Sequence, residues 1–121
     1  MEKNIKWGIV GLGRIARAFA EGLKHTDNGT LHCVGSRDLD KAIRFAEEWD
    51  APHSAGSYEE LAKREDIDAV YVATPHSEHA RLARLCMNHG KAVLCEKPMA
   101  VNAKQVETMI QCAKENNVLL M

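Results

Sequence analysis

The amino-acid sequence predicts an α/β fold, a doubly wound parallel sheet that forms a single domain. Two patterns support this prediction. Short apolar segments alternate with amphipathic segments of helical period along the chain, which is typical of parallel strands covered by helices on both faces. A glycine-rich turn also closes the first apolar segment and leads straight into a helical one. With 121 residues, the chain has the length of one ordinary domain.

The apolar segments predict six strands, over residues 5–10, 30–36, 53–55, 68–73, 92–96 and 118–121. The periodicity of the intervening segments predicts five helices, over residues 14–25, 39–49, 57–64, 77–88 and 102–116. The first of these helices has a clear apolar stripe, formed by Ala16, Phe19, Ala20 and Leu23. We therefore expect one complete doubly wound unit with the strand order 3-2-1-4-5-6.

Composition and charge are those of a soluble globular protein, with 45% hydrophobic residues, 27% charged residues and a formal net charge of -1. The 16 basic residues are spread among 17 acidic ones without a basic block, which argues against nucleic acid or a membrane as a partner. No signal peptide or bilayer-spanning run is recognisable, so we expect a cytoplasmic protein. The cysteines form no CxxC pair and are expected to be reduced, buried thiols: Cys33, Cys86, Cys95 and Cys112.

The glycine-rich turn has the pattern of a dinucleotide-binding site. Gly11 permits a tight turn out of the strand, Gly13 lets the backbone approach a pyrophosphate, and Ala16 lets the helix pack closely on the sheet. The amides at the start of the helix would then face the phosphates. The alternative is a purely structural turn. The whole motif reads Gly11-Leu12-Gly13-Arg14-Ile15-Ala16.

The end of the second strand predicts which dinucleotide is bound. An acidic residue there would favour NAD, but the sequence has Ser36 followed by Arg37. A guanidinium can pair with a 2′-phosphate and stack on adenine, so we favour NADP, with NAD as the alternative. Asp38 would repel that phosphate unless it faces away, and we expect it to cap the next helix. Arg37 has its own alternative role as an ordinary exposed charge.

The fourth strand runs into a polar turn at the carboxyl edge of the sheet, where ligands of doubly wound folds collect. Pro75 fixes the chain direction, and Thr74 could offer its hydroxyl and backbone amide to a cofactor, or be an ordinary turn residue. His76 and His79 are three residues apart, but no third ligand has suitable spacing, so no metal site is predicted. The segment reads Thr74-Pro75-His76-Ser77-Glu78-His79.

The fifth strand ends in Glu96-Lys97-Pro98 at the same edge. Lys97 is then a positioned cation that could orient a substrate hydroxyl or carbonyl near the nicotinamide, with Glu96 adjusting the local charge. A pair of ordinary surface charges is the alternative.

These three motifs, in this order and spacing, resemble the N-terminal half of the Gfo/Idh/MocA oxidoreductase family, whose first domain is a Rossmann fold. Segments 57–61 and 93–99 are most similar to the dihydrodiol and NADP-linked sugar dehydrogenase branch. The resemblance implies that Lys97 is catalytic and lies beside the nicotinamide and substrate, and that Gly11 and Gly13 hold the pyrophosphate. It also implies that Leu12, Arg14 and Ile15 line the same turn. Thr74 and His79 would lie along the cofactor, and Glu96 would face its nicotinamide end. Ser36, Arg37 and Pro75 complete the expected cofactor-binding residues, because of their places at the ends of the strands.

The resemblance also concerns domain organisation and function. Family members carry a second domain with substrate contacts, a further catalytic tyrosine or histidine and most of the oligomer interface. Residues 1–121 are expected to be the dinucleotide-binding domain alone, without that C-terminal substrate domain. The expected activity is hydride transfer between NADP and a sugar-like or diol hydroxyl carbon of a small molecule, with little turnover by this domain itself. The alternatives are a non-catalytic NAD(P)-binding or sensing module and an isolated domain with an exposed apolar docking face; oligomerisation is left open.

Overall fold

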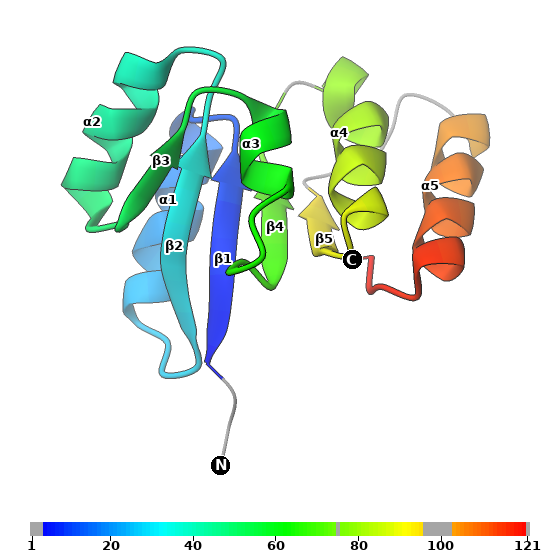
Figure 1. Cartoon of the computed structure of the whole chain (residues 1–121), viewed down its shortest axis with the longest axis horizontal. Helices are drawn as coiled ribbons and strands as arrows, with labels where there is room; N and C mark the ends of the chain where they lie inside the picture. Colours follow the sequence, from blue (N-terminus) through cyan, green and yellow to red (C-terminus); the bar gives the residue numbers. More distant parts are fainter. Residues whose placement is uncertain (1–3, 75, 96–102, 121) are drawn as a thin grey trace.

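The computed structural model describes residues 4–74, 76–95 and 103–120. Its centre is a sheet of five parallel strands in the order β3-β2-β1-β4-β5 (Figure 1). The chain crosses from one side of β1 to the other between β3 and β4, so the strand order reverses next to β1. This is the switch point of a doubly wound sheet. The strands are β1 (Ile5–Val10), β2 (Gly29–Gly35), β3 (His53–Ala55), β4 (Ala69–Val72) and β5 (Ala92–Cys95).

Helices cover both faces of this sheet. The first face carries α1 (Arg14–Lys24) and α2 (Leu39–Trp49). The opposite face carries α3 (Tyr58–Ala62), α4 (His76–Asn88) and α5 (Ala103–Asn116). The predicted doubly wound α/β fold is therefore confirmed, with helix and strand ends that shift by a few residues. No helix in the described segments is both long and apolar enough to cross a membrane.

The predicted sixth strand is reduced to a single bridge. Leu120 pairs in parallel with Val93 of β5, and the amide of Val93 donates a hydrogen bond to the carbonyl of Leu119 at 2.8 Å. The position beside β5 agrees with the predicted order 3-2-1-4-5-6. The full strand predicted over 118–121 is thus wrong for residues 118–120, the part that the structure describes, and Asn117 just before them adopts a left-handed conformation with φ 53°.

Two apolar layers hold the helices on the sheet. Leu61 of α3 is fully buried, and it lies against two glycines on neighbouring strands. A Cβ atom at Gly8 or Gly35 would come within 3.0 Å of the Leu61 methyl groups. The glycines thus let α3 approach the sheet closely. The four cysteines are buried and free, as predicted.

Candidate functional site

The carboxyl ends of the strands meet at one edge of the sheet. The residue pairing aligns Val10 of β1 with Gly35 of β2 and with Val72 of β4, and it aligns Val72 with Cys95 of β5. The segments that follow these residues therefore begin at the same level. They contain the glycine turn, the Ser36-Arg37 pair and Thr74, which lie far apart in the sequence.

The glycine turn packs directly against the end of β4. Gly11 has a positive φ of 88°, and a Cβ atom at this position would lie 2.8 Å from Cγ2 of Thr74 and 2.9 Å from its backbone nitrogen. The amide of Gly11 donates to the carbonyl of Gly35 at 3.3 Å. Thr74 itself is buried, with 6% of its surface exposed. The turn is thus fixed between β2 and β4, at the switch point.

The start of α1 has the features needed to receive an anion. Gly13 is the N-cap residue and supplies no side-chain cap, and the first turn of α1 contains no acidic residue. A Cβ atom at Gly13 would meet nothing within 4 Å, so the space in front of the turn is open. The free amides and positive end of a helix attract phosphate groups. A pyrophosphate therefore fits the residues of this turn.

The other residues of the turn divide between core and surface. Leu12 is partly buried and packs against the apolar layer under α1 and α2. Arg14 and Ile15 open α1 and are exposed, Ile15 to 47%. Ala16 is fully buried against the sheet, which confirms the prediction that a small residue is needed there.

The end of β2 leads through Ser36 and Arg37 into α2. Asp38 caps α2, as predicted: its Oδ1 accepts from the amides of Asp40 at 3.0 Å and Lys41 at 3.4 Å. The hydroxyl of Ser36 accepts from the amide of Asp38 at 3.1 Å, while Arg37 is exposed. The Asp38 carboxylate therefore accepts hydrogen bonds from the amides of α2, while Arg37 remains exposed at the end of β2.

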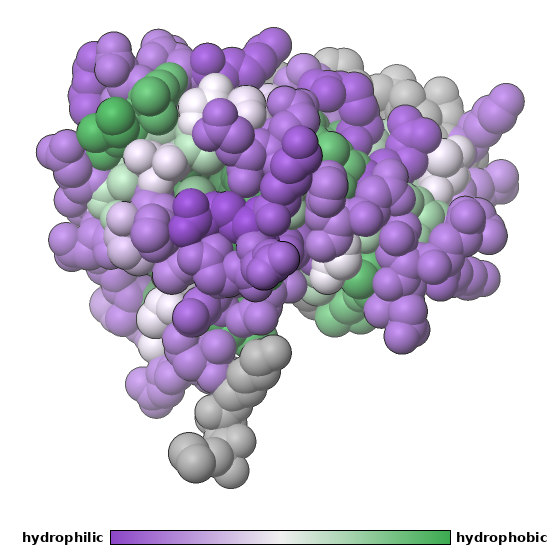
Figure 2. Space-filling view, viewed as in Figure 1, coloured by the Kyte–Doolittle hydropathy of each residue, from purple (hydrophilic) through white to green (hydrophobic). Residues whose placement is uncertain are grey.

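Sequence reasoning missed an apolar surface beside Arg37. Leu39 begins α2 and is 49% exposed, and Ile43, one turn later, is also exposed. Figure 2 shows a green patch of apolar residues over α2. An exposed leucine at the first position of a helix gives no distinctive sequence signal, because single exposed apolar residues are common.

Several predicted site residues fall outside the described structure. These are Pro75, Glu96 and Lys97, together with Pro98. His79 lies within α4, which begins just after the Thr74 turn. Cys95 is the last described residue before the Glu-Lys-Pro segment, and it lies at the carboxyl edge in line with Val72.

An apolar hollow lies between α1 and the strands β4 and β5, beside the carboxyl edge of the sheet. Its volume is about 410 Å³, and Phe19 of α1 stacks on Tyr71 of β4 within it, with ring centroids 4.1 Å apart. Burial raises the pKa of the Cys95 thiol to about 11, so this thiol stays neutral at physiological pH. The lining residues are Ile15, Ala18, Phe19, Tyr71, Leu94 and Cys95.

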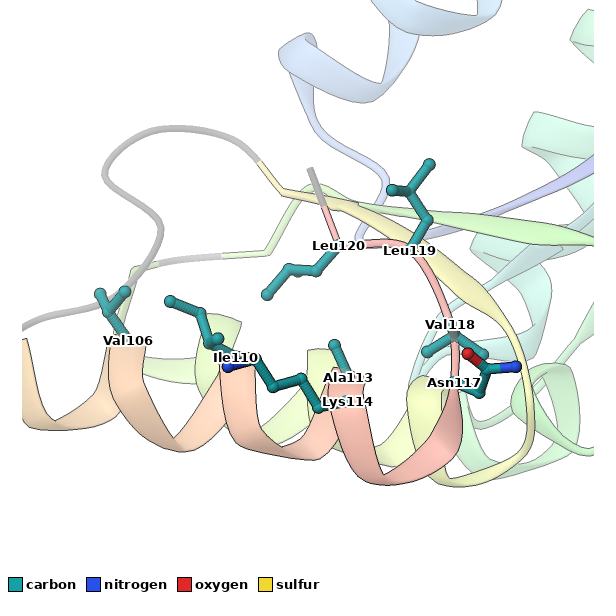
Figure 3. Close-up of a pocket in the computed structure, with 8 residues that line it drawn as sticks. All are labelled: Val106, Ile110, Ala113, Lys114, Asn117, Val118, Leu119 and Leu120. Carbon is teal, nitrogen blue, oxygen red and sulfur yellow. The ribbon is translucent and has the colours of Figure 1, made fainter.

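A second apolar groove lies at the opposite end of the molecule from α2. It runs between α5 and the segment that follows it, with Ile110 and Leu120 pointing toward each other across the opening (Figure 3). Its volume is about 510 Å³, and Ile110 and Leu119 are 43% and 59% exposed. The groove belongs to a different part of the fold from the glycine turn.

Comparison with known proteins agrees with this arrangement. Residues 5–121 match the family model for the Gfo/Idh/MocA oxidoreductases, described as an oxidoreductase family with an NAD-binding Rossmann fold. The chain belongs to this family. The predicted resemblance is thereby confirmed over nearly the whole sequence.

Two relatives of this chain are dehydrogenases by name and are longer than it. The chain is 43% identical over 119 residues to trans-1,2-dihydrobenzene-1,2-diol dehydrogenase of Mus musculus, and 44% identical over 118 residues to the Xenopus laevis enzyme of that name. Each alignment covers at least 96% of this chain and 36% of the relative. The chain thus spans about a third of the length of these relatives.

Two solved structures have the same fold as this chain. A 3-ketoreductase from Actinomadura kijaniata, in complex with TDP-benzene and NADP, has a TM-score of 0.93 and 33% identity. A probable dehydrogenase from Thermotoga maritima has a TM-score of 0.91 and 31% identity. The alignments cover 98% and 97% of this chain, and 38% and 35% of the two solved chains.

Proposed function

We propose that this family member is the NADP-binding domain of an oxidoreductase that transfers hydride between the nicotinamide and a sugar-like or diol hydroxyl carbon. The observation that carries the proposal is the glycine turn fixed against Thr74, with the open start of α1 in front of it. Gly11 and Gly13 hold the pyrophosphate, and Leu12, Arg14 and Ile15 form the rest of the turn around it. Thr74, Pro75 and His79 lie along the cofactor. The dehydrogenase and ketoreductase names of the relatives support the reaction class.

NADP is the proposed cofactor because of the charges at the end of β2. Arg37 is exposed and pairs with the 2′-phosphate, while Ser36 leaves room where a carboxylate would favour NAD. The Asp38 carboxylate opposes this phosphate only weakly because it accepts two hydrogen bonds from helix amides. The exposed Leu39 offers an apolar surface on which adenine can pack.

Parallel titrations with NADP and NAD test the cofactor assignment, followed through tryptophan fluorescence or the melting temperature. We expect tighter binding of NADP, and Arg37→Ala should remove this preference while NAD binding persists. Arg44→Ala is the matched control, because it removes the same charge from an exposed position inside α2. Equal affinity of the wild-type chain for both cofactors would contradict the role of Arg37. Absence of binding by either would contradict the site itself.

We further propose that Lys97 is the catalytic residue, orienting the reacting substrate oxygen by a hydrogen bond while Glu96 adjusts the charge around it. The nicotinamide supplies the hydride chemistry. In the whole enzyme, Lys97→Ala should lower kcat strongly and leave NADP affinity nearly unchanged. Unchanged turnover in this variant would overturn the catalytic assignment. A sensing module would instead show no turnover and would keep its cofactor affinity and its output in the variant.

The domain assignment is also a proposal. The chain forms the dinucleotide-binding domain, and a separate C-terminal domain of the whole protein supplies the substrate contacts. The partial coverage of the relatives supports this, since about a third of each relative aligns with the chain. Adding the remaining two thirds of the protein should restore dehydrogenase activity. Robust activity of residues 1–121 by themselves would contradict it.

A further inference from the structure

Two histidines and an aspartate form a cluster on the face of the sheet that α3 covers. His32 lies in β2, His53 begins β3, and Asp66 belongs to the segment between α3 and β4. This segment passes in front of the sheet in Figure 1, and the middle of the same face is strongly hydrophilic in Figure 2. Each of the three residues offers one metal-ligating atom, and these atoms all lie within 4.8 Å of one another.

A β-bulge brings the two histidines together. Leu31 pairs with Trp7 of β1 and Cys33 pairs with Gly8, so His32 is an extra residue that has no partner on β1. A bulge redirects the side chain of the inserted residue. Since Cys33 also pairs with His53 of β3, His32 comes to lie beside His53, with ring centroids 4.9 Å apart.

The ligating atoms converge on one carboxylate oxygen. Oδ2 of Asp66 is 2.8 Å from Nε2 of His32 and 4.0 Å from Nε2 of His53. Ligands of a tetrahedral Zn²⁺ ion with bonds of about 2.0–2.2 Å stand about 3.4 Å apart. The two separations from Oδ2 each differ from this value by about 0.6 Å, and all three ligating atoms lie within 4.8 Å of one another. His53 and Asp66 are also 42% and 38% exposed, so water can reach the remaining coordination position.

Arg64 orients the Asp66 carboxylate and contacts the oxygen that would bind the ion. Arg64 donates to Asp66 through Nε to Oδ1 at 2.9 Å and through Nη2 to Oδ2 at 2.8 Å. An ion at Oδ2 would displace Nη2 and leave the Nε–Oδ1 contact to orient the group.

We propose that His32, His53 and Asp66 bind one divalent transition-metal ion of the Zn²⁺ class, with water completing the coordination. Two imidazoles and one carboxylate suit zinc, whereas magnesium and calcium prefer oxygen ligands. The bound ion would join β2, β3 and the segment before β4. The role of the ion is structural, because the cluster lies away from the glycine turn. An ion that binds the folded chain there stabilises the folded state.

The test is a calorimetric titration of the reduced chain with Zn²⁺ near neutral pH, repeated with Co²⁺ to record the absorption bands of the bound ion. We expect one ion per chain and a higher melting temperature in its presence. His53→Gln should weaken binding at least about tenfold and abolish the thermal shift. This variant is the decisive one, because the 4.0 Å separation from Asp66 is too long for a hydrogen bond whose loss would perturb the fold.

Three further variants define the ligands. His32→Gln should weaken Zn²⁺ binding as His53→Gln does. His25→Gln is the matched control, because this exposed histidine is the C-cap residue of α1 and is not one of the proposed ligands. His76→Gln tests the only histidine pair that the sequence suggested. Zinc affinity that is unchanged in His53→Gln, loss of binding in His76→Gln, or no saturable binding by the wild-type chain would each overturn the proposal. In the last case the cluster is a hydrogen-bonded network alone.

Discussion

Gly11 touches Thr74 so closely that no side chain fits between the first glycine turn and the end of β4. A Cβ atom at Gly11 would lie 2.8 Å from the Thr74 methyl group and 2.9 Å from the Ala73 carbonyl carbon. Two motifs that are more than sixty residues apart in the sequence thus form one surface. The contact makes the shape of the turn depend on the position of β4, and it leads to the first two predictions.

Gly11→Ala should destabilise the chain by at least about 2 kcal/mol, because alanine is strained at a positive φ and its Cβ would clash with backbone atoms. Urea or thermal unfolding measures the change in the free energy of unfolding. Gly22→Ala is the matched control in the exposed interior of α1, where a Cβ meets nothing within 4 Å. That change should stabilise the chain by about 0.5–1 kcal/mol. Equal stability of the Gly11→Ala variant and the wild type would refute the strained contact.

Gly13→Ala should weaken NADP binding with little change in the free energy of unfolding. Its φ of -98° is available to alanine and its Cβ direction is open, so the free energy of unfolding should fall by less than about 1 kcal/mol. The added methyl group would occupy the space proposed for the pyrophosphate, so NADP affinity should fall at least about tenfold. Fluorescence titration measures the affinity. A variant that binds NADP normally would show that the phosphates lie elsewhere.

Asp38→Ala should lower the free energy of unfolding by about 1 kcal/mol, because α2 loses its side-chain cap. Asp38→Asn keeps the capping oxygen and should retain most of that stability. Chemical denaturation of the two variants measures the difference. If the alanine and asparagine variants are equally destabilised, the negative charge and not the cap is what stabilises α2.

The buried thiols should resist modification in the native state. Burial raises the pKa of Cys86 to about 12, and that of Cys33 and Cys95 to about 11, from an ordinary value of 9.0. These raised values favour the folded chain below about pH 9, and that contribution is lost as the pH rises toward 11. Disulfide-exchange reagents at mildly alkaline pH should therefore label the chain slowly until urea is added. Rapid labelling without denaturant would contradict the burial.

The sequence predicted the order and nature of the elements because local patterns encode them. The apolar run over β1 and the stripe of α1 each follow a period that one element alone determines. The capping role of Asp38 was predictable for the same reason, since it is decided within three residues. The sixth strand was harder to predict, because its length depends on where the chain turns after α5 and how it meets β5.

In the candidate site too, local sequence predicted some residues, whereas others could be found only from the tertiary structure. The glycines, Ser36 and Arg37 could be chosen from their places after the predicted strands. The surface beside them required the tertiary structure, since the exposure of Leu39 depends on how α2 lies over the strand end. The cluster of His32, His53 and Asp66 has no sequence signal, because its members are separated by 21 and 13 residues.

The sequence by itself determined the fold class, the family and the positions of the cofactor motifs, because each depends on residues close together in the chain. Only the tertiary structure decided that Gly11 packs on Thr74 and that His32 lies beside His53. Both contacts result from strand register, which is set by packing across the whole sheet. A bulge of one residue redirects a side chain, and the local sequence of β2 does not specify it.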